Sequence, residues 1–178
     1  FLRHTLGKLG YTAYDWGQGI NLGLRPGMEE DGYEMLSRVF QAHGEKVSLI
    51  GWSAGGIFAR ELARDHPEMV RRVITLGSPI RGNPKATRAW KAFKRLSKGP
   101  RVREMFDAQA IHLRSQPLEV PTTCVYSKLD GIVAWQLCTT LPAPESENVE
   151  VRCSHLGFGH HLEPLYVIAS RLAADSRV

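Results

Sequence analysis

A glycine-flanked serine stands in this chain between an apolar, strand-like run and a helical one. Residues 46–52 read KVSLIGW, residues 51–55 read GWSAG, and helical spacing follows over residues 54–66. A Gly-x-Ser-x-Gly at a strand-to-helix junction is typical of a nucleophile elbow, a sharp turn that exposes one serine at the carboxyl edge of a sheet. Ser53 is therefore the candidate nucleophile for attack on a carbonyl carbon.

The turn itself sets two further requirements. We expect glycine at Gly51 and Gly55 because a side chain at either position would collide with neighbouring backbone. The helix that begins at Ala54 points the positive end of its dipole toward the serine. The backbone N–H of Ala54 is therefore the expected donor to an oxyanion that develops during attack.

A serine is a weak nucleophile unless a base accepts its proton and an acid orients that base. Asp130 fits the acid, because it follows the strand-like run at residues 122–127 and precedes Gly131, which allows a tight turn. His155 fits the base, because it comes just after the strand-like run at residues 148–153. This chain order, with acid and base in loops after later strands, predicts a Ser-His-Asp triad.

The base has alternatives. His160 lies one loop beyond His155 and is its main rival. His155, His160 and His161 could also form a metal site, but no second cluster of carboxylates or cysteines accompanies them, so we expect no metal. The other histidines belong to helical segments, their ends or the segment between strands: His4, His43, His66 and His112.

The acid has alternatives as well. Asp130 with Gly131 could be an ordinary turn, since Asp-Gly pairs favour turns. In that case Asp107 or Glu119 would have to orient the base. The very apolar strand before Asp130 favours Asp130, because it puts the carboxylate at a strand end.

The elements that must position these residues alternate between strand and helix. Strand-like runs occupy residues 11–16, 46–52, 71–77, 122–127 and 148–153. Helical patterns occupy residues 1–9, 30–44, 54–66, 133–138 and 162–174. Such alternation predicts an α/β fold with a mostly parallel sheet and helices on both faces.

Residues 84–116 interrupt the alternation with helical patterns and no strand, which indicates a small helical cap or lid. Nine Lys or Arg and no Asp or Glu lie within residues 81–103. We favour a cap helix with solvated charges over a lid that makes weak contact with anionic lipid, and we expect no specific binding of nucleic acid. The apolar side of this helix would carry Trp90, Phe93 and Leu96.

Composition is that of one soluble domain spanning residues 1–178. The chain is 43% apolar and carries a net charge of +5. No run approaches the roughly 18 apolar residues of a membrane span, and the first residues lack a signal-peptide pattern, so we expect a cytoplasmic protein. Three cysteines without Cys-x-x-Cys spacing indicate neither a zinc site nor a disulfide scaffold, although a single Cys138–Cys153 bridge is an alternative.

A glycine-rich loop follows the first strand-like run. Residues 17–23 read GQGINLG and are similar to a dinucleotide fingerprint, but Leu22 stands where the third glycine is needed. A loop beside the active-site pocket is the better interpretation, and we expect no cofactor.

Five blocks of this sequence resemble the α/β-hydrolases, and more narrowly small bacterial lipase-like and esterase-like members. The blocks are GYTAYDWGQGINLG, VSLIGWSAGGIFARELA, VITLGSPIRG, YSKLDGIVAWQ and ENVEVRCSHLGFGHH, in the family's order. The resemblance implies a triad of Ser53, Asp130 and His155 that cleaves a small-molecule ester. Thioesterases and acyltransferases share this triad, and a catalytically silent ligand- or partner-binding domain is the alternative of another class.

The resemblance has a gap at the start of the chain. Such hydrolases carry a strand and a short loop before the first helix, and that loop donates a backbone N–H to the oxyanion. Here the first helix begins at Phe1. We therefore expect the first strand, which would lie between residues 11–16 and 46–52, and the oxyanion loop to be missing, so that the 178-residue chain alone is poorly soluble and inactive.

Overall fold

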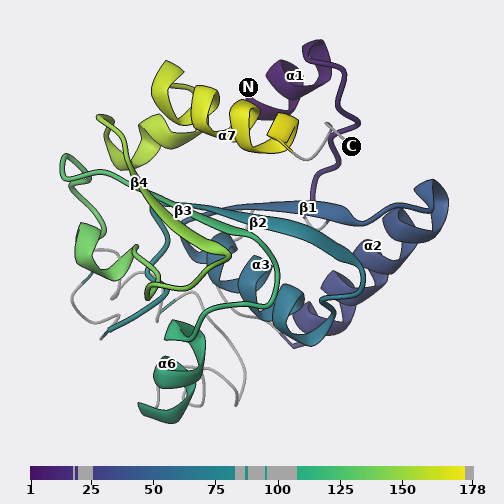
Figure 1. Ribbon diagram of the computed structural model, residues 1–178, viewed down its shortest axis with the longest axis horizontal. Coiled ribbons are helices and arrows are strands. Elements are labelled where there is room, and N and C mark those ends of the chain that lie inside the picture. The colour runs from purple at the N-terminus through teal and green to yellow at the C-terminus, as the bar shows by residue number, and fades with distance from the viewer. Residues whose placement is uncertain (18, 20–25, 83–86, 88–94, 96–107, 175–178) are drawn as a thin grey trace.

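The fold is built on a sheet of four parallel strands. The computed structural model describes residues 1–17, 19, 26–82, 87, 95 and 108–174. The strands are β1 (Val47–Trp52), β2 (Val70–Leu76), β3 (Thr122–Tyr126) and β4 (Ser146–Glu150). They lie side by side in that order, each parallel to its neighbour (Figure 1). The predicted parallel sheet is confirmed.

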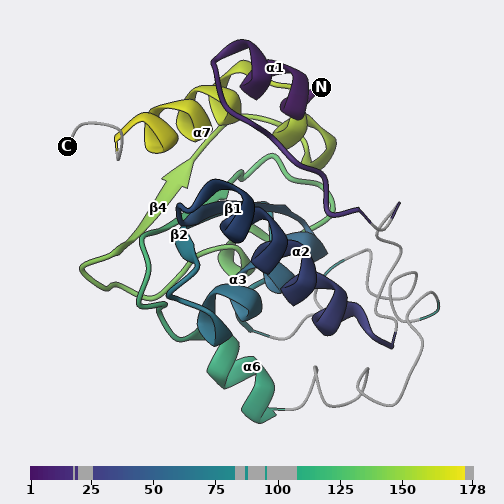
Figure 2. The same ribbon diagram turned by 90° about the vertical axis from the view of Figure 1, so that its right-hand side faces the viewer.

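Helices cover both faces of this sheet, as predicted. One face carries α2 (Met28–His43) and α3 (Ala54–Asp65), and the other carries α1 (Leu2–Lys8) and α7 (Leu162–Ala174) (Figures 1 and 2). Helix α2 is followed by Gly44, whose left-handed backbone (φ 67°, ψ 14°) suits glycine and ends the helix. Among the helices that the structure describes, none is long and apolar enough to cross a membrane.

Strand β2 supplies both hydrophobic cores because successive side chains of a strand point to opposite faces. Val73 packs in the cluster that includes Leu36 of α2 and Ala63 of α3. Ile74 and Leu76, two residues apart on the other face of the strand, pack in the cluster that includes residues 167, 168 and 172 of α7. The sheet is therefore buried on both sides, which is typical of parallel sheets between helix layers.

The strand predicted at residues 11–16 does not form: this segment has no regular secondary structure and pairs with none of the described strands. A strand needs a neighbour for its backbone groups, and the described partner of β1 is β2 alone. Side chains hold the segment instead. The Tyr14 hydroxyl lies 2.7 Å from Nε2 of His43, and Arg3 forms a 2.7 Å ion pair with Asp15.

The helix predicted at residues 133–138 is only a 3₁₀ turn, η2 (Trp135–Leu137). Two reasons are local. The Asp130 carboxylate accepts hydrogen bonds from the N–H groups of Ile132 and Val133, which fixes them as part of the loop. Ala134 then has an extended backbone (φ −62°, ψ 125°), so helical geometry begins one residue later.

Most of the cap predicted at residues 84–116 lies outside the described residues. So do most of the 17–23 loop and most of the basic residues within residues 81–103. The described part of the cap is α6 (Ala108–Ser115), which lies beside α3. The buried guanidinium of Arg60 on α3 donates to the carbonyl oxygens of Arg114 and Gln116 at 3.3 and 2.8 Å. These bonds satisfy carbonyls at the end of α6.

All three cysteines are buried and free, so the alternative of a Cys138–Cys153 disulfide is wrong. Burial raises the pKa of the Cys124 and Cys138 thiols. Burial also raises the pKa of Cys153, to about 11, and the nearby Asp130 charge adds to this rise. The three side chains are therefore neutral thiols at neutral pH.

The packing of α7 gives a first prediction. Ile168 is fully buried in the α7 cluster, whereas Tyr166 on the same helix is 75% exposed. Ile168→Ala should lower the free energy of unfolding by about 2–5 kcal/mol, because it leaves a cavity, and Tyr166→Ala should change it by less than about 1 kcal/mol. Urea denaturation followed by circular dichroism measures both. Equal effects of the two changes would contradict the described packing.

Candidate active site

The strand ends form one edge along which the candidate residues lie. Beyond the last residues of the strands, three backbone hydrogen bonds continue the ladder: Ser53 N–H to Leu76, Gly77 N–H to Val125 and Val151 N–H to Tyr126, each 2.9 Å. Ser53 follows β1, Asp130 follows β3 and His155 follows β4. Because carboxyl ends of parallel strands meet at the same edge, the three loops leave the sheet together.

Ser53 has a backbone conformation that side chains rarely adopt. Its φ is 54° and its ψ is −125°, and it is the one non-glycine residue with positive φ in the described parts of the chain. Such a conformation costs about 1–3 kcal/mol and persists only where the surroundings enforce it. It is the geometry expected of a serine at the tip of a sharp strand-to-helix turn.

The predicted roles of the glycines need one correction. A Cβ at Gly51 would lie 2.5 Å from the carbonyl oxygen of Gly55, so the backbone of α3 leaves no room there. A Cβ at Gly55 would meet nothing within 4 Å, so the prediction for that glycine is wrong. The second crowded position is Gly56, where a Cβ would lie 2.7 Å from the Cβ of Ser78. A Cβ at Gly55 would face away from β1, because successive residues of a helix point in different directions and the one that faces β1 is Gly56.

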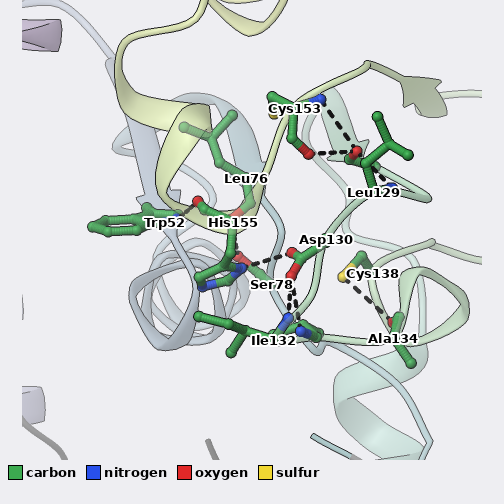
Figure 3. Close-up of polar contacts among 12 residues, drawn as sticks. Trp52, Leu76, Ser78, Leu129, Asp130, Ile132, Ala134, Cys138, Cys153 and His155 are labelled. Atoms are coloured by element: carbon green, nitrogen blue, oxygen red, sulfur yellow. Dashed lines mark hydrogen bonds and ion pairs between the residues drawn. The ribbon is translucent and has the colours of Figure 1, made fainter. Parts of the chain in front are cut away.

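Asp130 and His155 form a buried pair (Figure 3). The Oδ2 atom of Asp130 lies 2.6 Å from Nδ1 of His155, and the two side chains are only 1% and 6% exposed. The Oδ1 atom accepts the N–H groups of Ile132 and Val133 at 2.8 and 2.9 Å. Both carboxylate oxygens are thus occupied, and the imidazole is fixed by one of its two nitrogens.

The electrostatics of the pair favour an ionised carboxylate. Burial raises the pKa of Asp130, but the hydrogen bond from His155 and those from the N–H groups of Val133 and Ile132 outweigh burial, so its pKa lies below the ordinary value. A carboxylate can only accept, so Nδ1 of His155 carries the donated hydrogen. In the neutral ring this leaves Nε2 with a free lone pair, the form that can accept a proton from a serine.

Sequence reasoning missed Ser127, which joins the loops that carry the acid and the base. Its buried Oγ donates to the Cys153 carbonyl at 2.7 Å and accepts the N–H groups of Leu129 and Cys153 at 3.1 and 3.3 Å. Leu129 adjoins Asp130, and Cys153 lies two residues before His155. The available signal was a polar residue ending the apolar strand of residues 122–126.

Aromatic side chains surround the imidazole and were also missed. Phe158 meets the ring of His155 edge-on, with ring centroids 6.1 Å apart and an interplanar angle of 87°. Trp52 lies 5.6 Å from the same ring, centroid to centroid. Gly77 makes room for this arrangement, since a Cβ there would lie 2.5 Å from Phe158. Trp52 could have been noticed because it is adjacent to Ser53.

The rival residues lie elsewhere. His160 and His161 are exposed, as is Glu119, and Asp107 lies outside the described residues. His66 directly follows α3, and its Nδ1 lies 3.6 Å from Oε1 of Glu68. Among the described residues, no group of three His, Cys, Asp or Glu side chains could hold a metal ion.

Comparison with known proteins identifies the fold. No protein-family model matches the sequence. A pimeloyl-[acyl-carrier protein] methyl ester esterase of Yersinia enterocolitica is 42% identical over 45 residues, which are 25% of this chain and 17% of that esterase. A monoacylglycerol lipase of Paleococcus ferrophilus matches with a TM-score of 0.57 and 14% identity over 82% of this chain and 75% of its own.

A second solved structure, lipase B of Aspergillus fumigatus, matches with a TM-score of 0.62 and 16% identity, over 86% of this chain and 43% of its own. These structural similarities establish the fold, but sequence identities this low leave the activity open. The chain has the α/β-hydrolase fold, as predicted.

The crowding at the elbow predicts opposite outcomes for neighbouring glycines. Gly56→Ala should destabilise the protein by about 1–3 kcal/mol, because its methyl group would overlap Ser78. Gly55→Ala should be neutral or stabilise α3 by up to about 1 kcal/mol, since the position is open and alanine favours helix. Thermal unfolding of both variants measures these changes in stability. A larger loss for Gly55→Ala would contradict this geometry.

The lowered pKa of Asp130 predicts a pH dependence of stability. A carboxylate whose pKa is depressed by folding stabilises the protein above the unfolded pKa of about 3.9, and this contribution is lost as pH falls through the folded value. Asp130→Asn should therefore be less stable than the wild type at pH 7, and the difference should shrink below about pH 4. A constant difference from pH 7 to pH 2 would show that the Asp130 charge contributes nothing.

Proposed function

We propose that this chain is a serine hydrolase that cleaves a carboxylic ester. The observation that carries the proposal is the buried Asp130–His155 hydrogen bond of 2.6 Å, at the same sheet edge as the strained Ser53. A buried acid that fixes one imidazole nitrogen and leaves the other free is what a general base requires. A serine forced into positive φ at a helix start is what a nucleophile elbow requires.

In the proposed reaction Ser53 Oγ attacks the ester carbonyl carbon while Nε2 of His155 accepts its proton. Asp130 stabilises the resulting imidazolium and keeps the ring oriented. The N–H of Ala54, at the first position of α3, has no acceptor within the helix and is free to stabilise the oxyanion. The imidazolium then protonates the leaving alcohol. Water, giving a proton to Nε2 of His155, next attacks the carbonyl carbon of the acyl group on Ser53, and the imidazolium returns the proton to Ser53 Oγ as the carboxylic acid leaves.

The substrate class rests on the comparisons and on the chemistry of the triad. The short match to a methyl ester esterase supports an ester over other acyl compounds, and the fold shared with two lipases is compatible with that choice. A small-molecule ester stays a prediction. No step of the proposed reaction needs a metal or cofactor. Cytoplasmic location and weak contact of residues 81–103 with anionic lipid stay predictions.

A fluorophosphonate probe separates an enzyme from a silent binding domain of this fold. Such probes react with a serine only when a base activates it. Labelling of the full-length protein that disappears in Ser53→Ala supports the hydrolase, and absent labelling of the folded full-length protein supports the silent domain. Turnover of matched ester and thioester substrates, with and without an acceptor alcohol, then distinguishes esterase from thioesterase and acyltransferase.

In the full-length protein, substitutions in the triad should cause a shared loss of ester hydrolysis. Ser53→Ala and His155→Ala should each lower kcat on the order of 10⁴-fold or more, and the double variant should be little worse than either, because triad members act as a unit. Asp130→Asn should lower kcat strongly through the wrong imidazole tautomer. His160→Ala is the matched control and should keep activity. Retained activity in His155→Ala with loss in His160→Ala would reassign the base.

A further inference from the structure

Trp52 is an exposed aromatic residue that contacts the proposed base. It ends β1, directly before Ser53, and is 43% exposed. Its Nε1 donates a hydrogen bond of 3.1 Å to the backbone oxygen of His155, across 103 residues of sequence. Its ring is tilted by 37° to the imidazole, with centroids 5.6 Å apart. Figure 3 shows the indole beside His155, on the side away from Asp130.

The indole therefore completes the surroundings of the imidazole. Asp130 holds Nδ1 and Phe158 meets the ring edge-on. Trp52 adds the third contact and also fixes the main chain that carries the ring. An indole N–H needs a partner when it is partly buried, and here the partner belongs to the proposed catalytic histidine.

We propose that Trp52 is a positioning residue for His155. Its N–H holds the backbone of the base, and its ring stabilises the imidazolium that forms when His155 takes the proton from Ser53. The inference rests on the proposed function for its role in turnover, and on geometry alone for its effect on His155.

The second effect follows from charge. A cation within about 6 Å of an indole centroid is stabilised by the negative face of the ring. Among the described contacts of the imidazole, the ionised partner is Asp130, which remains in every Trp52 variant. Phe158 carries no charge, and the Cys153 thiol two residues before the ring is neutral. Removing the indole should therefore make His155 harder to protonate.

NMR titration of the histidine rings tests this directly. Trp52→Leu removes both the ring and the donor, and should lower the pKa of His155 by about half a unit. Trp52→Phe keeps an aromatic face and loses the donor, so it should titrate closer to wild type. His155→Gln assigns the resonance. Tyr166→Leu, which removes a 75% exposed aromatic residue on α7, is the matched control and should not shift it.

Kinetics give the second readout. Both Trp52 variants should lower kcat about threefold to tenfold with KM nearly unchanged, because a less constrained base reacts more slowly without affecting binding. In Trp52→Leu the acid limb of kcat/KM should also move to lower pH, since the base must be neutral to act. Thermal unfolding by circular dichroism confirms that each variant is folded.

The outcomes separate this inference from the proposed function. Equal titration midpoints for His155 in wild type and Trp52→Leu overturn the ring's role, and unchanged kcat in Trp52→Phe overturns the donor's role. If Trp52→Leu does not fold, Trp52→Phe still tests the donor through kcat. A shifted midpoint in a protein that hydrolyses no ester would refute the hydrolase and leave the Trp52–His155 interaction standing.

Discussion

The close approach of β1 to α3 is the constraint from which the rest of the site follows. Gly51 and Gly56 face each other with no space for a side chain, and Ser78 fills the remaining volume beside them. A strand can turn into a helix over so short a distance only if the residue between them accepts an unfavourable backbone conformation. Ser53 is that residue, so its strained backbone at the sheet edge is a consequence of the packing of Gly51 against Gly56.

The acid and the base depend on a different kind of constraint. Strands β3 and β4 are short, and the loops beyond them would be free to diverge. The Ser127 hydroxyl and the Asp130 carboxylate make six hydrogen bonds, of which three join the two loops and three stabilise the loop of Asp130 itself. The geometry of the pair is therefore set by buried polar contacts rather than by apolar packing, and such contacts are costly to leave half satisfied.

The sequence predicts what depends on local patterns. The parallel strands and the helix after Ser53 follow from hydrophobic periodicity, and the loops of Asp130 and His155 follow from their places after strands. The prediction of a strand at residues 11–16 is wrong, because a strand forms only beside a partner strand, and strand propensity does not show whether a partner is adjacent. The roles of Ser127 and Trp52 could not be predicted for a related reason: their hydrogen-bond partners lie 26 and 103 residues away in the sequence.

The buried thiols described with the fold have a practical meaning. A cysteine reacts as its thiolate, and burial keeps Cys124, Cys138 and Cys153 both protonated and out of contact with solvent. Cys124 lies within β3, Cys138 beyond η2 and Cys153 between β4 and the base. Their rates of alkylation under native conditions would report how often the sheet and each of the two loops open. The three cysteines can therefore be used to measure local opening of the structure near the strand ends.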